Sequence, residues 1–249
     1  FDLPGSISGT VFRDDDISGT QNGSEPGLAG WTVYLDENNN GIADVASIAT
    51  YNSVDTPKAI ADRGITYSNR TVSGLVGTIV DINVTVTLTH PYDGELYLTL
   101  ISPANTPVIL ANYLGGSGDN YTYTTFDDEA ATYISAGAAP FTGSFKPYFD
   151  LAQLDGRDPN GTWKLRMDDK ALGNVGQLLS WSMQITYGNE DITTITDANG
   201  NYTFYGLGDG THHVREVTQT GFTQTAPTNG LRDVTISGGQ AVNDQDFGN

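Results

Sequence analysis

The sequence predicts an all-β fold. Apolar and polar residues alternate with a period of two in segments 80–88, 96–100, 163–167 and 179–187, whereas the helical period of 3.6 residues is nearly absent. Gly, Asp, Asn or Pro residues bound each segment, and the chain contains 30 glycines. Half-buried strands without intervening helices are typical of antiparallel β-sandwiches.

Each of the four segments has one apolar face, which we expect to be buried. The expected buried residues are Val80, Ile82, Val84, Val86 and Leu88, then Leu96, Leu98 and Leu100, then Trp163, Leu165 and Met167, and finally Leu179, Trp181, Met183, Ile185 and Tyr187. Segments 58–62 and 127–134 combine alanine with acidic residues and are expected to form short helical turns, too short to build a layer.

The charge of the chain excludes several classes of partner. Of 249 residues, 30 are acidic and 11 are basic, so the formal net charge is −19. Such a surface repels phosphate backbones and anionic headgroups, so we expect no nucleic-acid partner and no membrane insertion, and we expect divalent cations, calcium first, to bind. The absence of cysteine excludes disulfides and thiolate metal sites.

No apolar run is long enough to span a membrane, and no signal peptide is present. Because residue 1 is Phe1, we interpret the sequence as a piece of a larger multidomain chain.

The acidic excess is distributed unevenly. Residues 1–45 and 190–249 together carry 16 acidic and 3 basic residues, and all four lysines lie between them. The two ends therefore resemble each other more than either resembles the middle, as expected when one domain is inserted into a loop of another. We predict a discontinuous domain of residues 1–46 and 189–249 and an inserted domain of residues 47–188, and therefore expect the chain near residues 45 and 190 to lie close together.

Residues 14–25 have the spacing of a twelve-residue calcium loop. Oxygen-bearing side chains occupy positions 1, 3, 5, 9 and 12, Gly19 permits a sharp turn at position 6, and position 7 offers its carbonyl. The expected calcium ligands are Asp14, Asp16, Ser18, Thr20, Asn22 and Glu25. Strand-like segments flank the loop in place of the helices of an EF-hand. The alternative is a solvated acidic turn without an ion.

Residues 36–44 repeat this pattern. The expected ligands are Asp36, Asn38, Asn40, Ile42 through its carbonyl, and Asp44, with Gly41 at position 6. Position 12 is Ser47, which cannot bind the ion with a bidentate carboxylate. Either this second site is weak, or a carboxylate from beyond the insertion, Asp191 or Glu190, completes it.

The outer segments contain the phrases SISGTVF at residues 6–12, EPGLAGWTVYL at 25–35, TDANGNYTF at 196–204, VREV at 214–217 and DFGN at 246–249. In these phrases they resemble the SdrD B-like, Cna-B-related repeats of bacterial surface proteins. The resemblance implies an Ig-like or prealbumin-like β-sandwich, and it assigns to Asp191 the acidic residue that precedes the Thr-Asp strand. A Lys–Asn isopeptide crosslink, found in related domains, is excluded because the outer segments contain no lysine.

The middle of the chain contains the phrases THPYDGEL at 89–96, LISP at 100–103, TFDDEA at 125–130, LDG at 154–156, GTWKL at 161–165, GQL at 176–178 and SW at 180–181. In these phrases it resembles the P domain, or homo B domain, of subtilisin-like proprotein convertases. The family usually has Asp where Glu95 stands and Gly where Asn105 stands. The resemblance implies an eight-stranded jelly-roll sandwich in which acidic turns bind calcium in some members.

The middle domain offers two further pairs of metal candidates, Asp127 with Asp128 and Asp168 with Asp169, which follow or end predicted strands. For each pair, a polar turn without an ion is the alternative. Adjacent carboxylates also suggest glycoside hydrolysis, but they bind calcium or water more often than they catalyse.

Catalysis is not indicated by the sequence. The three histidines are His90, with a structural role, and His212 and His213 in a turn, and the chain lacks both the Gly-x-Ser-x-Gly and the His-Glu-x-x-His motif. We predict a non-enzymatic, calcium-binding structural or adhesion module of a secreted or cell-surface protein. The alternatives are a module that binds a glycan or a protein, for which Tyr113, Tyr121, Tyr123 and Tyr133 are candidate contacts, and a P domain that stabilises or regulates a serine protease elsewhere in the parent chain.

Overall fold

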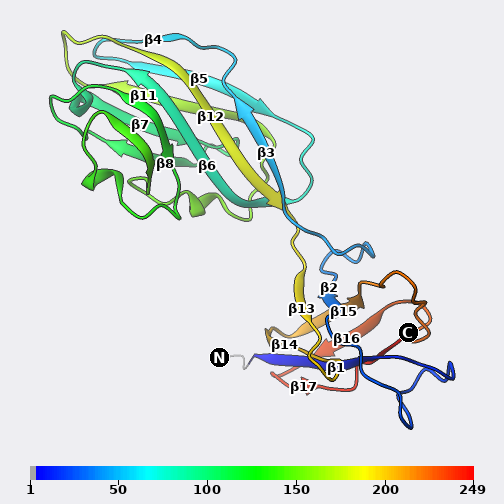
Figure 1. Ribbon diagram of the computed structural model, residues 1–249. Coiled ribbons are helices and arrows are strands. Elements are labelled where there is room, and N and C mark those ends of the chain that lie inside the picture. The colour runs from blue at the N-terminus through cyan, green and yellow to red at the C-terminus, as the bar shows by residue number, and fades with distance from the viewer. Residues whose placement is uncertain (1–3) are drawn as a thin grey trace. The chain divides into compact units, whose positions relative to one another are not determined.

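A computed structural model describes residues 4–249 of the chain (Figure 1). The predicted all-β class is confirmed, since strands hold 48% of the residues and helices only 4%. The chain forms two compact units: unit 1 comprises the described residues up to Val45 together with Asn189–Asn249, and unit 2 comprises Ala46–Gly188. Within the described residues, no helix is long and apolar enough to cross a membrane.

Unit 1 is built from two sheets. Its strands are β1 (Gly5–Phe12), β2 (Thr32–Leu35), β13 (Ile192–Ile195), β14 (Asn201–Leu207), β15 (Gly210–Glu216), β16 (Arg232–Ile236), β17 (Ala241–Val242) and β18 (Phe247–Gly248). One sheet has the order β14-β1-β17, with β18 also paired to β1, and the other has the order β13-β2-β15-β16. Strand β2 thus lies between two strands that follow the middle of the chain, and β13 pairs with it antiparallel from Ile192 opposite Leu35.

Apolar side chains from both sheets fill the core of unit 1. These buried residues are Ile7, Val11, Trp31, Val33, Leu35, Tyr202, Phe204, Leu207, Val214, Val234, Ile236 and Phe247. Burial of this apolar surface holds the early and late segments of the chain together, because β1 and β2 of the early segment each pair between two strands of the late segment.

Unit 2 is also a two-sheet structure. Its strands are β3 (Ser47–Asn52), β4 (Lys58–Ile60), β5 (Ile65–Val72), β6 (Thr78–Thr89), β7 (Leu96–Ile101), β8 (Pro107–Asn112), β9 (Tyr121–Phe126), β10 (Phe141–Phe145), β11 (Gly161–Asp169) and β12 (Gly176–Gly188). Three short 3₁₀ helices are η1 (Asp93–Glu95), η2 (Ile134–Ala136) and η3 (Leu151–Leu154). The first sheet has the order β10-β9-β6-β12-β3, with β4 also paired to β12, and the second has the order β5-β11-β7-β8. The long strands β6 and β12 run side by side in Figure 1, with the shorter β3 next to β12.

The four predicted strands lie within β6, β7, β11 and β12, but three of their expected buried positions are wrong: Leu179 is exposed, and Val80 and Tyr187 are only half-buried. Leu178 is fully buried and Leu179 is 40% exposed, because the pairing of β12 with β6 shifts register between Leu178 and Ser180. A second shift occurs between Thr186 and Tyr187, and at that end of β6 Ile79 is buried while Val80 is only half-buried. A β-bulge adds one residue to one strand, so the alternation of side chains changes face.

The helical turn expected at residues 58–62 is wrong. Lys58–Ile60 forms β4 and pairs antiparallel with β12. Ile60 is buried in the core of unit 2, so pairing and burial outweigh the weak helical preference of a short alanine-containing segment. In the second predicted segment, a 3₁₀ helix includes only its last residue, Ile134.

Close backbone contact at Gly27 predicts that unit 1 loses stability when this residue is given a side chain. Gly27 forms a bridge with Phe12, and a Cβ atom at Gly27 would lie 1.7 Å from the carbonyl oxygen of Asn199. Because this atom belongs to the backbone, G27A should reduce the free energy of unfolding by about 1–3 kcal/mol, measured by chemical denaturation. G208A is the control, since a Cβ there would meet nothing within 4 Å. Equal stability of the two variants would contradict the close packing.

Candidate metal centres

The first candidate site is the loop between β1 and β2 in unit 1. Asp14, at position 1, is only 5% exposed. Its Oδ1 accepts a hydrogen bond from the backbone N–H of Ser18 (2.9 Å), and its Oδ2 accepts one from that of Gly19 (2.9 Å) and one from the hydroxyl of Thr225 (2.6 Å). Burial and three donors therefore fix this carboxylate before any ion binds.

The remaining predicted ligands of the first loop converge on one point. The side-chain nitrogen of Asn22 donates to Asp16 Oδ2 (3.1 Å), to Ser18 Oγ (3.1 Å) and to the carbonyl oxygen of Thr20 (3.4 Å). Hydrogen bonds to the carboxylate of Asp16, from Asn22 first and from Ser18 next, lower the pKa of Asp16. The amide nitrogen thus occupies the point where oxygens from positions 3, 5 and 7 meet, which is where a cation would bind.

Glu25, at position 12, closes the first loop. Its Oε1 accepts a hydrogen bond from the N–H of Asp15 (2.9 Å), and its Oε2 accepts one from the N–H of Asn22 (2.9 Å). Carboxylate oxygens of Asp14, Asp16 and Glu25 all lie within 4.8 Å of one another. The structure therefore brings together all six residues that the sequence predicts for this loop.

The second candidate site follows β2, and its hydrogen bonds repeat those of the first. Asp36, fully buried, accepts from the N–H of Asn40 through Oδ1 (2.9 Å) and from the N–H of Gly41 through Oδ2 (2.8 Å), as Asp14 does at the same loop positions. Asp44 Oδ2 accepts from the side-chain amides of Asn38 (2.6 Å) and Asn40 (3.0 Å). Positions 3, 5 and 9 are therefore again linked through side-chain amides.

Asp191, just before β13, takes the place of Glu25 in this second loop. Its Oδ1 accepts a hydrogen bond from the N–H of Glu37 (3.1 Å) and its Oδ2 accepts one from the N–H of Asp44 (2.8 Å), which are loop positions 2 and 9. These are the two positions whose N–H groups Glu25 accepts in the first loop. Burial raises the pKa of Asp191. The neighbouring Glu190 is exposed.

Sequence reasoning missed Arg215 of β15. Its Nε lies 2.7 Å from Asp36 Oδ2, and its Nη2 donates to Asn39 Oδ1 (3.0 Å). Burial opposes ionisation of Asp36, but hydrogen bonds from Gly41, Arg215 and Asn40 outweigh it, and the pKa of Asp36 is lowered. The only signal in the sequence is the position of Arg215 in the VREV phrase, one of only three basic residues in the outer segments.

The acidic pair Asp127 and Asp128 of unit 2 has mainly backbone partners. Asp128 accepts hydrogen bonds from the N–H groups of Leu151 (3.0 Å) and Ala152 (2.8 Å) at the start of η3, and Asp127 accepts one from the N–H of Glu129 (2.8 Å). These contacts are those of a polar turn and a helix N-terminus. A metal ion at this pair stays a prediction.

The second pair of unit 2 divides between two roles. Asp168 is buried, and its Oδ2 forms ion pairs with Arg166 and Lys170, both at 2.6 Å, so cationic side chains already neutralise it. Asp169 is also buried, but it faces the imidazole of His90 and the carboxylate of Glu95. The structure therefore does not place the two carboxylates of the pair in one common site.

Histidine contacts give no sign of a serine nucleophile. Within residues 4–249, the ring nitrogens of His90 contact Tyr92 and Asp169, that of His212 contacts the carbonyl of Gly208, and that of His213 contacts Asp233. None of these partners is a hydroxyl group, so the described residues do not form the serine–histidine contact that acyl transfer requires.

A buried carboxyl group in unit 1, that of Glu216, predicts that the free energy of unfolding depends on pH. Glu216 is 7% exposed; burial raises its pKa from 4.5 to about 7, and the hydrogen bond from Asn249 opposes only part of this. Because the folded state binds this proton more tightly than the unfolded state, the stability that the proton contributes is lost as the pH rises from 4.5 to about 7.

The variant E216Q keeps the shape of the side chain without the charge. It should be more stable than the wild type at pH 8, by up to about 3 kcal/mol, and the difference should vanish near pH 4, measured by chemical denaturation across this range. A difference that is constant with pH would contradict this assignment.

The chain therefore consists of two β-sandwich units, and unit 1 carries both acidic loops. The model of the proprotein convertase P-domain family matches residues 79–185, which extend from β6 to β12 within unit 2. This segment covers the phrases in the middle of the chain that resemble the same family.

The relatives include a leupeptin-inactivating enzyme, a calcium-dependent protease and a serine-aspartate repeat-containing protein. Leupeptin-inactivating enzyme 1 of Streptomyces exfoliatus is 30% identical over 135 residues, which are 54% of this chain and 24% of that protein. A calcium-dependent protease of Trichormus variabilis is 31% identical over 112 residues, 44% of this chain and 14% of that protein. Serine-aspartate repeat-containing protein F of Staphylococcus epidermidis is 26% identical over 206 residues, 82% of this chain and 12% of that protein. The chain therefore spans less than a quarter of the length of each of these curated relatives.

The solved structures that align with this chain share a lower sequence identity with it than these curated relatives do. A serine protease of Aeromonas sobria aligns with a TM-score of 0.38 and 21% identity, over 58% of this chain and 27% of that chain.

Proposed function

We propose that the chain is a non-catalytic, calcium-binding module of a secreted or cell-surface bacterial protein. One calcium ion would bind residues 14–25 and a second would bind residues 36–44 together with Asp191. The observation that carries this proposal is the repeated hydrogen-bond pattern, in which Asp191 accepts from loop positions 2 and 9 as Glu25 does. The location is proposed from the resemblance of the outer segments to repeats of bacterial surface proteins, and the similarity to serine-aspartate repeat-containing protein F is in keeping with that resemblance.

The charge of the two loops explains why an ion would stabilise unit 1. The first loop collects the carboxylates of Asp14, Asp16 and Glu25, and like charges at such distances repel each other. A divalent cation offsets this repulsion and accepts oxygen ligands of the kind present in both loops. An ion that binds only the native state at a hundredfold its Kd adds about 2.7 kcal/mol to the free energy of unfolding.

The test is thermal unfolding with calcium and with EDTA. We expect the transition of unit 1 to move to a higher temperature with calcium and back after chelation, whereas magnesium, which prefers a smaller octahedral site, should shift it less. A melting temperature that EDTA does not change would rule out the proposal.

A role beside a protease is the second candidate. The P-domain match and the names of two relatives, a leupeptin-inactivating enzyme and a calcium-dependent protease, favour a parent chain that also carries a catalytic domain. Unit 2 would then stabilise or regulate that domain. The test is the domain content of the full-length protein, followed by the half-life of its protease activity with and without residues 46–188. No catalytic domain, or an unchanged half-life, would exclude this role.

Glycan binding is favoured by one depression in unit 2. It has a volume of about 290 Å³, and its lining combines hydroxyl and amide side chains with Tyr123 and Trp181. Tyr123 is 71% exposed and Tyr133 is 51% exposed, whereas Tyr121 is fully buried, so the expectation that Tyr121 is available to a sugar is wrong. A glycan array with wild type, Tyr123→Ala and Tyr133→Ala tests this: binding lost only in Tyr123→Ala supports it, and no binding by the wild type excludes it.

A further inference from the structure

We propose that His90, Glu95 and Asp169 of unit 2 form a site for a transition-metal ion of the Zn²⁺ type. The three residues come from different elements: His90 follows β6, Glu95 ends η1 and Asp169 ends β11. One ligand atom from each lies within 4.8 Å of the others. The side chains of His90 and Asp169 are fully buried, and Glu95 is half-buried.

The hydrogen bonds of His90 leave one ring nitrogen without a suitable partner. Nδ1 lies 2.9 Å from the carbonyl oxygen of Tyr92, which can only accept, and 3.3 Å from the backbone nitrogen of the same residue; the shorter contact assigns the proton to Nδ1. In the neutral ring, Nε2 then presents a lone pair to Asp169 Oδ2 at 3.3 Å, and this oxygen is also an acceptor. Two buried acceptors in contact require a cation between them, either a proton on Nε2 or a metal ion.

The distance between these two atoms favours the metal. A charge-assisted hydrogen bond from an imidazolium to a carboxylate typically measures about 2.7–2.9 Å, shorter than the 3.3 Å found here. Two ligands about 2.0–2.1 Å from a tetrahedral Zn²⁺ lie about 3.3 Å apart. The carboxylate of Glu95 provides a third ligand, and solvent can reach it because Glu95 is half-buried.

Each proposed ligand also has an outer partner that would orient it. Nδ1–H of His90 donates to a backbone carbonyl, as the second ring nitrogen of metal-binding histidines usually does. The side-chain nitrogen of Asn174 contacts both oxygens of Glu95 (3.1 and 3.0 Å), and the N–H of Ala171 donates to Asp169 Oδ1 (3.0 Å). Oδ2 of Asp169 therefore stays directed at His90.

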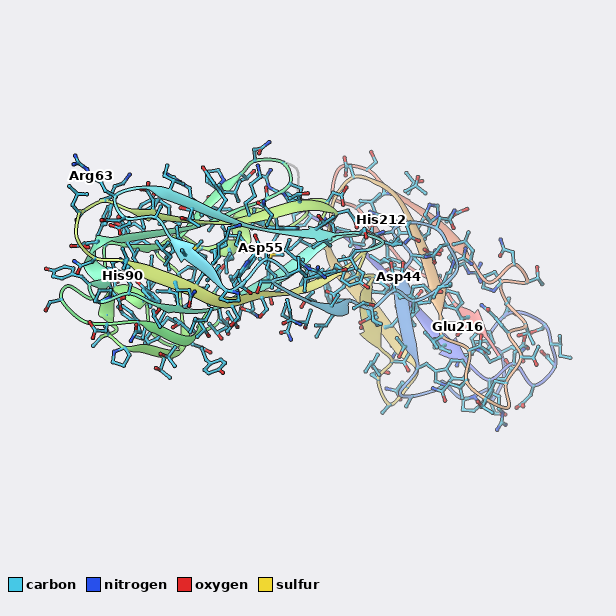
Figure 2. The ribbon with its side chains drawn as sticks, turned by 90° about the horizontal axis from the view of Figure 1, so that it is seen from above. Asp44, Asp55, Arg63, His90, His212 and Glu216 are labelled. Atoms are coloured by element: carbon cyan, nitrogen blue, oxygen red, sulfur yellow. The ribbon has the colours of Figure 1, made fainter. Side chains whose placement is uncertain are left out.

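The ligand set and its surroundings distinguish this site from the calcium loops. An imidazole nitrogen favours Zn²⁺ and similar ions, whereas Ca²⁺ takes about six to eight oxygens. Two carboxylates balance the charge of one divalent ion. Next to the site, a depression of about 610 Å³ is lined in part by Arg63, Gly64 and Asp169. His90 and Arg63 lie toward the same end of unit 2 in Figure 2.

The experiment is a Co²⁺ and Zn²⁺ titration of the full chain saturated with Ca²⁺, so that the oxygen-rich loops of unit 1 do not compete. We expect one equivalent of Co²⁺ to give the visible absorption of a four-coordinate site, and Zn²⁺ to remove it. His90→Gln should abolish the signal, and Asn174→Ala should weaken binding about 10–100-fold. His212→Gln, which changes a histidine of unit 1, should have no effect.

Three results would overturn the proposal. The first is the absence of stoichiometric binding by the wild type. The second is binding that survives in His90→Gln, which would mean an adventitious ion only. The third is an NMR spectrum of the protein with excess Zn²⁺ in which both nitrogens of His90 stay protonated, as in an imidazolium–carboxylate pair. Circular dichroism of His90→Gln establishes that the variant folds, and Asn174→Ala tests the site independently if it does not.

Discussion

Replacing Asp191 by asparagine should remove one of two calcium ions, although Asp191 is 147 residues distant from its loop partner Asp44 in the sequence. The variant keeps the size of the side chain and loses the charge and one of the oxygens that accept from loop positions 2 and 9. Calorimetric titration should then find one ion in place of two. At a calcium concentration of a hundredfold Kd, the variant should lose about 2.7 kcal/mol of calcium-dependent stabilisation.

The matched control is Glu190→Gln, which removes the same charge from the adjacent, exposed residue. This control should bind two ions with unchanged affinity, because Glu190 is not part of the hydrogen bonds that define the loop. If Asp191→Asn still binds two ions, or if Glu190→Gln loses one, Asp191 does not complete the second site.

Truncation of Trp163 to alanine should cause the largest loss of stability in unit 2. Trp163 lies on β11, its side chain is fully buried, and its indole N–H donates to the carbonyl of Pro159 (2.8 Å). The variant leaves a cavity between the two sheets and an unpaired carbonyl, so the free energy of unfolding should fall by about 3–5 kcal/mol. Scanning calorimetry in the presence of calcium can measure this on the transition of unit 2.

Two control variants help to interpret the loss of stability in Trp163→Ala. Trp163→Phe should cost less than the alanine variant, because the phenyl ring fills part of the cavity. Leu172→Ala changes a residue that is 67% exposed and should stay within about 0.5 kcal/mol of the wild type. A loss below about 1 kcal/mol in Trp163→Ala would contradict the position of this side chain in the core.

The sequence predicts the class of fold well because each sandwich strand buries only one face. The alternation in residues 80–88 and 179–187 locates β6 and β12, and the pairing of Trp181 with Val86 joins them in one sheet. What the alternation does not contain is the register shift between Leu178 and Ser180, since a bulge depends on how the partner strand pairs. For the same reason β4 is predicted as a helical turn: its strand conformation comes from pairing with β12.

The candidate sites follow the same division between local and distant interactions. The spacing of residues 14–25 predicts six ligands, and the structure brings these residues together because they are close in sequence, whereas the spacing does not indicate the contact of Thr225 with Asp14. In the second loop the spacing leaves a choice between Asp191 and Glu190, and the structure directs only Asp191 at the loop. Arg215 at Asp36 and the grouping of His90 with Asp169 depend on strand pairing, and no local motif indicates them.

The most direct test of calcium binding in unit 1 is a crystal structure of the chain grown with calcium, with anomalous scattering to locate the ions. We predict two calcium ions: one bound by the Asp14–Glu25 loop through Asp14, Asp16 and Glu25, the other bound by Asp36, Asp44 and Asp191. Loops that hold only water, or a second ion bound without Asp191, would contradict the proposal.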